Sequence, residues 1–241
     1  MTTYLISDLH LHESRPQVTQ AFFDFLRGPA AGAEALYILG DFFEVWVGDD
    51  DDAPLGREVL EELSRYSGTG AELYLMHGNR DFLLGQDFAQ HAGALLLPDP
   101  SLVTLGNHKM LLMHGDTLCT RDTEYLAFRQ QARDPNWQEA QLAKPLEERR
   151  AFAAQIRAVS KSMSSRKTED IMDVTQEEVE RVMREHGVHL LVHGHTHRPA
   201  RHPFSIDGEP AERIVLGDWG DQGWCLKADG KALELMHWPI G

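Results

Sequence analysis

Thr3-Tyr4-Leu5-Ile6-Ser7-Asp8-Leu9-His10 is a short apolar run that stops abruptly at a carboxylate and an imidazole. Side chains alternate along an extended segment, so Asp8 and His10 are expected to turn to the same side. Gly194-His195-Thr196-His197 repeats this spacing after the apolar run 188–192. Short continuous apolar runs of this kind are typical of buried strands in an α/β sheet.

Three more apolar runs end in polar residues in the same manner. Gly40-Asp41 follows 35–39, Gly78-Asn79-Arg80-Asp81 follows 72–76, and His114-Gly115-Asp116 follows 109–113. Ligands of open α/β sheets gather beyond the carboxyl ends of the strands. The five clusters are therefore expected to converge on one site.

The donor groups in these clusters suit a two-metal centre. They are carboxylates, imidazoles and one amide, with no thiolate, and this mixture favours Mn, Fe, Zn or Co. Asp41 can act as a bridge, because one carboxylate has an oxygen for each of two cations about 3.5–4 Å apart. Glu44 and Asp116 lie in the same blocks and are interpreted as groups that orient histidine ligands. His193 is a marginal candidate, since strand alternation can place it near the metals.

The remaining patterns predict an α/β fold with a helical insertion. Apolar spacing indicates helices at 16–26, 55–66 and 82–91, a hairpin around Gly106-Asn107, and a helix at 175–185 that begins with a capping box from Thr175 to Glu178. Turns at Asp207-Gly208 and Asp229-Gly230 predict short antiparallel strands. Helix formers dominate 121–167. We therefore expect residues 1–120 and 171–241 to form the core and residues 121–170 the insertion.

The composition limits the classes of function. The 241 residues carry a net charge of −15, which weighs against non-specific binding to nucleic acid. No apolar run approaches the ~20 residues of a bilayer span. The N-terminal run lacks a basic segment and is too short for a signal peptide, so a cytosolic protein is expected. Two cysteines, Cys119 and Cys225, do not make a disulfide framework.

The five blocks, in this order, resemble those of the calcineurin-like metallophosphoesterases over nearly the whole chain. The resemblance implies a β-sandwich core flanked by helices and a dinuclear metal centre. Its implied ligands are Asp8, His10, Asp41, Asn79, His114, His195 and His197. The alternative is that these are unrelated loop and helix-cap residues, as any single block by itself could be.

Arg80 departs from the usual pattern of the family. The third block there reads Gly-Asn-His, and its histidine is a favoured proton donor to the leaving group, whereas here the position is arginine. Arginine cannot shuttle a proton at neutral pH, but it can clamp a phosphate with two donors. Without an acid, the leaving group must need no protonation. This favours cleavage of a pyrophosphate bond over that of a phosphomonoester or an alkyl phosphodiester.

Arg80, the length and the insertion resemble one branch of the family in particular, which acts in lipid A biosynthesis. The resemblance implies Mn²⁺-dependent hydrolysis of the pyrophosphate bond of UDP-2,3-diacylglucosamine at the α-phosphorus, with UMP and 2,3-diacylglucosamine 1-phosphate (lipid X) as products. It assigns catalysis to Asn79, Arg80 and His195. The implied substrate contacts are Asn79, Arg80, Asp122, Ser160, Ser164, Lys167 and His195. A monomer on the cytoplasmic face of the inner membrane is expected.

Two other functions remain open at this point. The first is a different dinuclear metallophosphoesterase, acting on a cyclic nucleotide, a nucleoside polyphosphate or a phosphoprotein. The second is an inert metal-dependent scaffold, against which the complete set of ligand residues argues.

The end of the insertion combines basic and apolar residues. Between Lys144 and Lys167 there are seven basic residues against two glutamates, while Phe152, Ile156, Val159 and Met163 form one helical stripe. The functional interpretation is a cap whose stripe shapes an acyl channel and whose basic surface contacts an anionic membrane. The alternative is a helix that packs its stripe on the core and exposes its basic face. The acidic run Asp49 to Asp52 is interpreted as a solvated loop.

Overall fold

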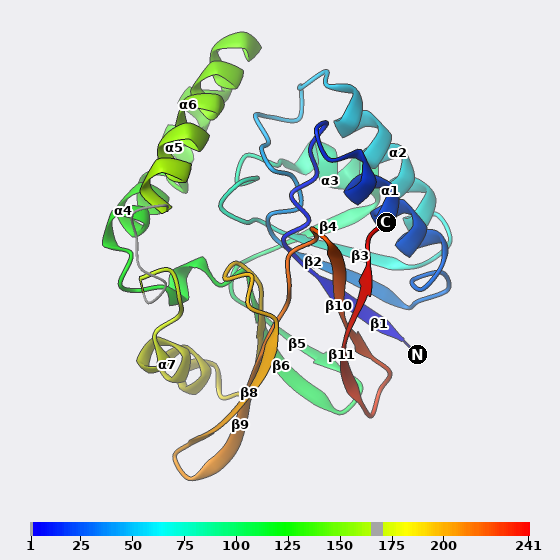
Figure 1. Ribbon diagram of the computed structural model, residues 1–241, viewed down its shortest axis with the longest axis vertical. Coiled ribbons are helices and arrows are strands. Elements are labelled where there is room, and N and C mark those ends of the chain that lie inside the picture. The colour runs from blue at the N-terminus through cyan, green and yellow to red at the C-terminus, as the bar shows by residue number, and fades with distance from the viewer. Residues whose placement is uncertain (1, 165–170) are drawn as a thin grey trace.

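Two β-sheets stacked face to face form the centre of the computed structural model (Figure 1). It describes residues 2–164 and 171–241, with the backbone alone for 159–164. The six-stranded sheet has the order β11-β10-β1-β2-β3-β4, and the five-stranded sheet has the order β5-β6-β7-β9-β8. The strands are β1 (Thr3–Ile6), β2 (Ala35–Leu39), β3 (Glu72–Met76), β4 (Ala94–Leu97), β5 (Ser101–Leu105), β6 (His108–Met113), β7 (Leu190–His193), β8 (Ala200–Ile206), β9 (Glu209–Val215), β10 (Gln222–Ala228) and β11 (Leu233–Pro239).

Strands near the middle of each sheet are buried on both faces. In β1, Tyr4 and Ile6 pack toward the helices, while Leu5 packs toward the other sheet. The layer between the sheets joins Leu5, Tyr37 and Met76 to Met110, Val192 and Ile214. This double burial explains why the strands appear as unbroken apolar runs in the sequence. The predicted α/β sandwich flanked by helices is confirmed.

Helices cover the outer face of each sheet. Helices α1 (Pro16–Arg27), α2 (Pro54–Ser67) and α3 (Gln86–Ala92) lie on the six-stranded sheet, and α7 (Gln176–His186) lies on the five-stranded one. The helix expected at 82–91 begins only at Gln86. Its start is fixed by Asp49, whose carboxylate accepts hydrogen bonds from the backbone N–H of Gly85 and Phe88 at 2.8 and 2.9 Å.

The capping box predicted for α7 does not form. Thr175 is the N-cap residue, but its side chain makes no cap hydrogen bond. Its hydroxyl lies 2.7 Å from that of Thr120 and 3.4 Å from the carbonyl of Leu118, while Glu178 pairs with Arg181. The tertiary contact with the segment after β6 takes the hydroxyl away from the local cap. The short strand β4, which the sequence analysis missed, follows α3 after one glycine.

In the described part of the segment between β6 and α7, a short 3₁₀ helix (Asp116–Leu118) is followed by three α-helices. They are α4 (Thr123–Ala132), α5 (Pro135–Leu142) and α6 (Leu146–Ser164), and they lie to one side of the sandwich (Figure 1). Carboxylates begin the first two, because Asp122 accepts from the N–H of Tyr125 and Asp134 accepts from that of Trp137.

The acidic run Asp49 to Asp52 is only partly solvated: the side chains of Asp50 and Asp52 are 65% and 76% exposed, yet both are paired with α6. Asp50 pairs with Arg149 of α6, and Arg150 reaches both Asp51 and Asp52 at 2.5 Å. Arg149 is 4% exposed and also donates to the carbonyl of Val47 at 2.6 Å. The run therefore holds the start of α6 against the core, and these two arginines do not form a free basic face.

One buried carboxyl group makes stability depend on pH. Burial and the charge of Asp116 raise the pKa of Asp99 to about 6, and both carboxyl oxygens of Asp99 are buried without a hydrogen-bond partner. The folded protein therefore retains this proton at pH values where the unfolded chain has lost it. The contribution of Asp99 to stability should therefore fall as the pH rises from about 4 to 6.

Asp99→Asn is expected to remove this loss. At pH 8 the variant should unfold with a free energy roughly 1–3 kcal/mol larger than that of the wild type, because no charge needs to be buried. Urea unfolding at pH 4 and pH 8 measures it, with the exposed Asp221→Asn as the control. Equal stabilisation at both pH values would contradict the explanation.

Candidate metal centre

Five strand ends from both sheets meet at one edge of the sandwich. They are the carboxyl ends of β1, β2 and β3 in one sheet and of β6 and β7 in the other. The five clusters converge beyond the carboxyl ends of the strands, as expected, and the site lies where the two sheets come together. The seven predicted ligand residues all follow these strands.

The first group of donors comes from β1 and β7. Nε2 of His10 lies 3.2 Å from Nε2 of His197, and Oδ1 of Asp8 lies 3.4 Å from the same His197 nitrogen. All three atoms fall within 4.8 Å of one another, as donors around one cation do. This geometry fits a metal held by two imidazoles and a carboxylate.

The second group adds an amide. Oδ1 of Asn79 lies 3.0 Å from Nε2 of His114 and 2.9 Å from Nδ1 of His195. Oδ1 of Asp41 lies 3.8 Å from Nε2 of His114, and its other oxygen, Oδ2, lies 3.8 Å from Nε2 of His10. Asp41 thus directs one oxygen toward each group, which is the geometry a bridging ligand needs.

A buried carboxylate oxygen without a hydrogen-bond partner at this site fits a bound cation. Oδ1 of Asp8 is buried and has no hydrogen-bond partner. Asp8 is 0% and Asp41 2% exposed, and burying a carboxylate without a positive partner is costly. Oxygen and imidazole donors with no thiolate suit divalent Mn, Fe, Zn or Co.

The charges of the site shift its ionisation strongly. Burial alone would lower the pKa of His114, but the surrounding carboxylates, Asp41 foremost, raise it to about 9. Burial and the charge of His114 lower the pKa of His195 to about 4. Burial raises the pKa of Asp41, so its ionised form needs more positive charge nearby. A divalent cation would supply that charge.

Backbone strain is concentrated at the same residues. Within the described part of the chain, six non-glycine residues have positive φ, and five of them are predicted ligands: Asp8 (55°), His10 (50°), Asp41 (49°), His195 (67°) and His197 (55°). The sixth is Asp207 (53°), in an exposed turn. Such conformations cost about 1 kcal/mol or more each and gather at functional sites. The expectation that Asp8 and His10 lie in an extended segment is therefore wrong, because each is in a left-handed turn.

Asp81 holds two of the ligand loops together. Its Oδ2 accepts from the N–H groups of Phe42 and Phe43 at 2.7 and 3.3 Å, and its Oδ1 accepts from that of Gly78 at 2.7 Å. A Cβ atom on Gly78 would collide with Asp41, so only glycine fits there. In the sequence this acid is visible only as part of its block, and its role in joining the loops was not predicted.

Glu44 and Asp116, which were expected to orient histidine ligands, and the marginal candidate His193 lie in different surroundings. Oε2 of Glu44 lies 3.0 Å from Nδ1 of His10, next to the ring as a residue that orients a ligand should be, although the contact is not a well-aligned hydrogen bond. Asp116 instead binds the hydroxyl of Tyr125 and accepts from Nε of Arg129 at 2.7 Å, so it does not orient a histidine by hydrogen bonding. His193 turns away from the ligands, because its ring nitrogens contact Gly194 and Arg213.

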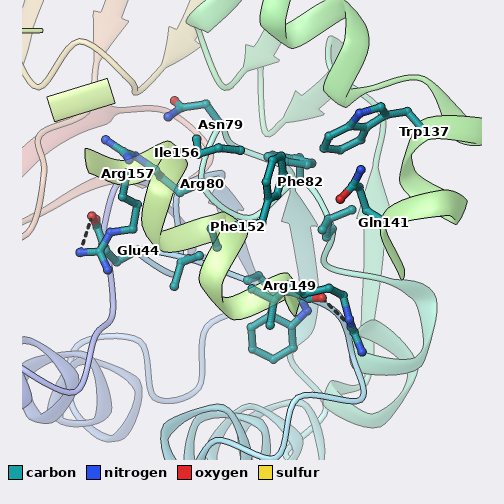
Figure 2. A pocket seen from close by; sticks show the side chains of 15 residues that line it. Glu44, Asn79, Arg80, Phe82, Trp137, Gln141, Arg149, Phe152, Ile156 and Arg157 are labelled. Atoms are coloured by element: carbon teal, nitrogen blue, oxygen red, sulfur yellow. Dashed lines mark hydrogen bonds and ion pairs between the residues drawn. The ribbon is translucent and has the colours of Figure 1, made fainter. Parts of the chain in front are cut away.

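A pocket connects α6 to the metal centre. Figure 2 shows Phe152, Ile156 and Arg157 of α6 facing Asn79 and Arg80 across it. The rest of the lining is mostly apolar and includes Val45, Trp46, Val47, Phe82, Leu83 and Trp137. Arg80 donates its backbone N–H to Oδ1 of Asp41 at 2.8 Å, and its side-chain Nε is buried without a partner. The guanidinium of Arg80 and an apolar pocket therefore both lie beside the cluster of candidate ligands.

The predicted substrate contacts fall in three places. Asn79, Arg80 and His195 lie at the centre and the pocket, and Asp122 begins α4. Ser160 and Ser164 lie in the part of α6 whose side chains are outside the described residues, as are those of Val159 and Met163. Lys167 lies outside the described residues altogether.

The sandwich and its cluster of carboxylate, imidazole and amide donors define a metallophosphoesterase. The chain belongs to the calcineurin-like phosphoesterase family, whose model matches residues 1–199, and members of this family use metal ions. A solved archaeal phosphodiesterase superposes with a TM-score of 0.50 at 14% identity, covering 100% of both chains, which shows the shared fold.

Several proteins that are similar to this chain over nearly its whole length have the same name. A UDP-2,3-diacylglucosamine hydrolase of Cellvibrio japonicus is 59% identical, covering 100% of both chains. Proteins of the same name from Chromohalobacter salexigens and Pseudomonas aeruginosa are 56% and 50% identical, covering 96% and 100% of this chain and 95% and 100% of theirs. Among the described residues, no helix combines the length and apolar character needed to cross a membrane.

Proposed function

We propose that the protein hydrolyses the pyrophosphate bond of UDP-2,3-diacylglucosamine in lipid A biosynthesis, to give UMP and 2,3-diacylglucosamine 1-phosphate (lipid X). The observation that carries the proposal is the apolar pocket under α6, which opens at Asn79 and Arg80 beside the ligand cluster. A lipid tail and a phosphate can thus bind in adjoining places. The relatives with this name match the chain over its full length.

Two Mn²⁺ ions are the proposed cofactors. Asp8, His10, Asp41 and His197 would hold one, and Asp41, Asn79, His114 and His195 the other; a ligand oxygen of Asp8 also lies within 4.8 Å of ligand atoms of Asp41 and His114. When bound, such ions polarise phosphoryl oxygens and lower the pKa of water so that a nucleophile is available near neutral pH. The left-handed turns and Asp81 hold the ligands in place before binding.

Arg80 is assigned to the phosphate. Its guanidinium is always charged and presents paired donors that match phosphate oxygens. Because the group that leaves is itself a phosphate, no residue needs to protonate it. Asn79 and His195, which contact each other at 2.9 Å, are assigned both to metal binding and to the phosphate.

The insertion, residues 121–170, is proposed as a cap over the substrate, on a core of 1–120 and 171–241. Asp122, Ser160, Ser164 and Lys167 would contact the sugar, the phosphates or the nucleotide. The lipid character of the substrate supports a peripheral position on the cytoplasmic face of the inner membrane. Arg149 and Arg150 do not support the membrane position, because both are paired with aspartates and are not part of a free basic face. The protein is proposed to act as a monomer.

The test is an assay of the purified protein with and without Mn²⁺. The substrates are UDP-2,3-diacylglucosamine, a cyclic nucleotide, a nucleoside polyphosphate, a phosphoprotein and bis(p-nitrophenyl) phosphate. We expect the lipid substrate to be cleaved at least 100-fold faster than the others, and only with metal. Preference for a soluble substrate would favour another metallophosphoesterase, and no activity on any would favour a scaffold.

Ile156→Asp should impair hydrolysis of the lipid without loss of metal. The charge would lie in the apolar pocket, where an unpaired carboxylate costs several kcal/mol, so we expect KM to rise at least 10-fold. Ala158→Asp adds the same charge at an exposed position of α6 and is the control. Metal content and far-UV circular dichroism should match the wild type. Equal effects of the two variants would count against an acyl site.

A further inference from the structure

We propose that Arg157 is a positioning residue, which couples the filling of the apolar pocket to the metal centre through Glu44 and His10. The inference rests on the proposed function, in which the pocket takes an acyl chain. Beyond that function, we infer that the bound acyl chain of the substrate affects the rate of the chemical step as well as binding.

The link is a continuous chain of three side chains. Nη2 of Arg157 lies 3.2 Å from Oε1 of Glu44, as the dashed line in Figure 2 shows, and Oε2 of Glu44 lies 3.0 Å from Nδ1 of His10. The opposite ring nitrogen of His10, Nε2, points to His197, Asp8 and Asp41. Glu44 therefore uses one oxygen for the insertion and the other for a ligand of the metal centre.

The inner part of this link is shielded from water. The side chain of His10 is 9% and that of Glu44 22% exposed, so their contact is screened only partly. Carboxylates on the far nitrogen of a metal-binding histidine fix the ring and raise its basicity, and their removal typically weakens metal binding 10- to 100-fold. Moving Glu44 would therefore turn the ring of His10 and weaken its hold on the cation.

The outer part of the link lies in the pocket. Arg157 and its neighbour Ile156 both line it, and Phe152 lines it one turn earlier. Arg149, which also lines the pocket, and Arg150 tie the start of α6 to the acidic run. Arg157 is farther along, with a 36% exposed side chain, and among the described residues it also contacts His12 at 3.4 Å. An acyl chain packed in the pocket would restrict the side chain of Arg157 to the position in which it contacts Glu44.

The kinetic consequence is specific. Binding energy from a part of the substrate that does not react can be used to orient the reacting groups, and shorter substrates then lose kcat as well as affinity. We expect kcat of the wild type to fall about 10-fold when both acyl chains are shortened to acetyl groups. In Arg157→Gln, kcat on the long-chain substrate should fall to the level of the short one, and the dependence on chain length should vanish.

The experiment measures kcat and KM separately on UDP-2,3-diacylglucosamine with long chains and with acetyl groups. The proteins are the wild type, Arg157→Gln, Arg157→Lys, Glu44→Gln and the control Arg150→Gln, which lies on the same helix but pairs with Asp51 and Asp52. Arg157→Lys should partly restore the dependence, because it keeps the charge. Calorimetric titration with Mn²⁺ alone should show affinity at least 10-fold weaker in Glu44→Gln and unchanged in Arg150→Gln.

Two results would overturn the coupling. One is a kcat that still depends on chain length in Arg157→Gln, with only KM raised, as a simple substrate contact would give. The other is wild-type Mn²⁺ affinity in Glu44→Gln. If the wild type cleaves neither form of the substrate, the proposed function fails, and the Mn²⁺ titration still decides whether Glu44 supports the metal centre.

Discussion

Asp41→Ala should lose both the activity and the second metal ion. Its two oxygens face different groups of ligands, each at 3.8 Å from a histidine nitrogen, so one substitution removes a donor from both cations. We expect kcat to fall by about 10³-fold or more, because charge stabilisation by metal ions is worth several kcal/mol. Metal analysis and the rate of hydrolysis are measured on the same preparation.

Asp207→Ala is the matched control for this substitution. Asp207 also has positive φ, at 53° against 49° for Asp41, but it lies in the exposed turn between β8 and β9. Both variants place alanine in a left-handed conformation, and only one removes a donor. Two ions per chain with near-normal turnover in Asp41→Ala would refute its bridging role.

Arg80→His should slow hydrolysis of the lipid substrate, although it restores the residue usual in the family. Imidazole loses the forked, permanently charged contact with phosphate. Such a contact supplies on the order of 2–4 kcal/mol in the transition state, or roughly 30- to 1000-fold in rate. Activity on an alkyl phosphodiester should rise at the same time, because that leaving group needs a proton.

The measurement is kcat/KM for both forms on both substrates, with metal content checked. Arg80→Lys is the control that keeps the charge without the fork, and its activity on the lipid should fall between the two. Neither substitution changes the backbone N–H of residue 80, which donates to Asp41, so we expect the ligand loop to be retained. Native hydrolysis that is unchanged or faster in Arg80→His would show that Arg80 does not clamp the phosphate.

Most of the sheet could be predicted from the sequence because its signal is local. Strands β1 and β2 are buried along their whole length and β3 is buried toward its end, so each has an apolar run with a sharp polar end. Those ends also carried the candidate ligands, and the order of the blocks indicated the family. Strand β4 was missed because it follows α3 after a single glycine, and its Leu95 is 64% exposed.

The sequence by itself thus determined most of the strands, the candidate ligand residues at their ends and the helical spacing that puts Phe152 and Ile156 on one face of α6. Only the tertiary structure decided that the ligands come from two sheets, that Asp8 and Asp41 are in left-handed turns, and that Glu44 joins His10 to Arg157. It also paired the acidic run with α6, across about a hundred residues. The reason is physical: periodicity and strand ends are set by neighbours in the chain, whereas these contacts depend on how distant layers pack.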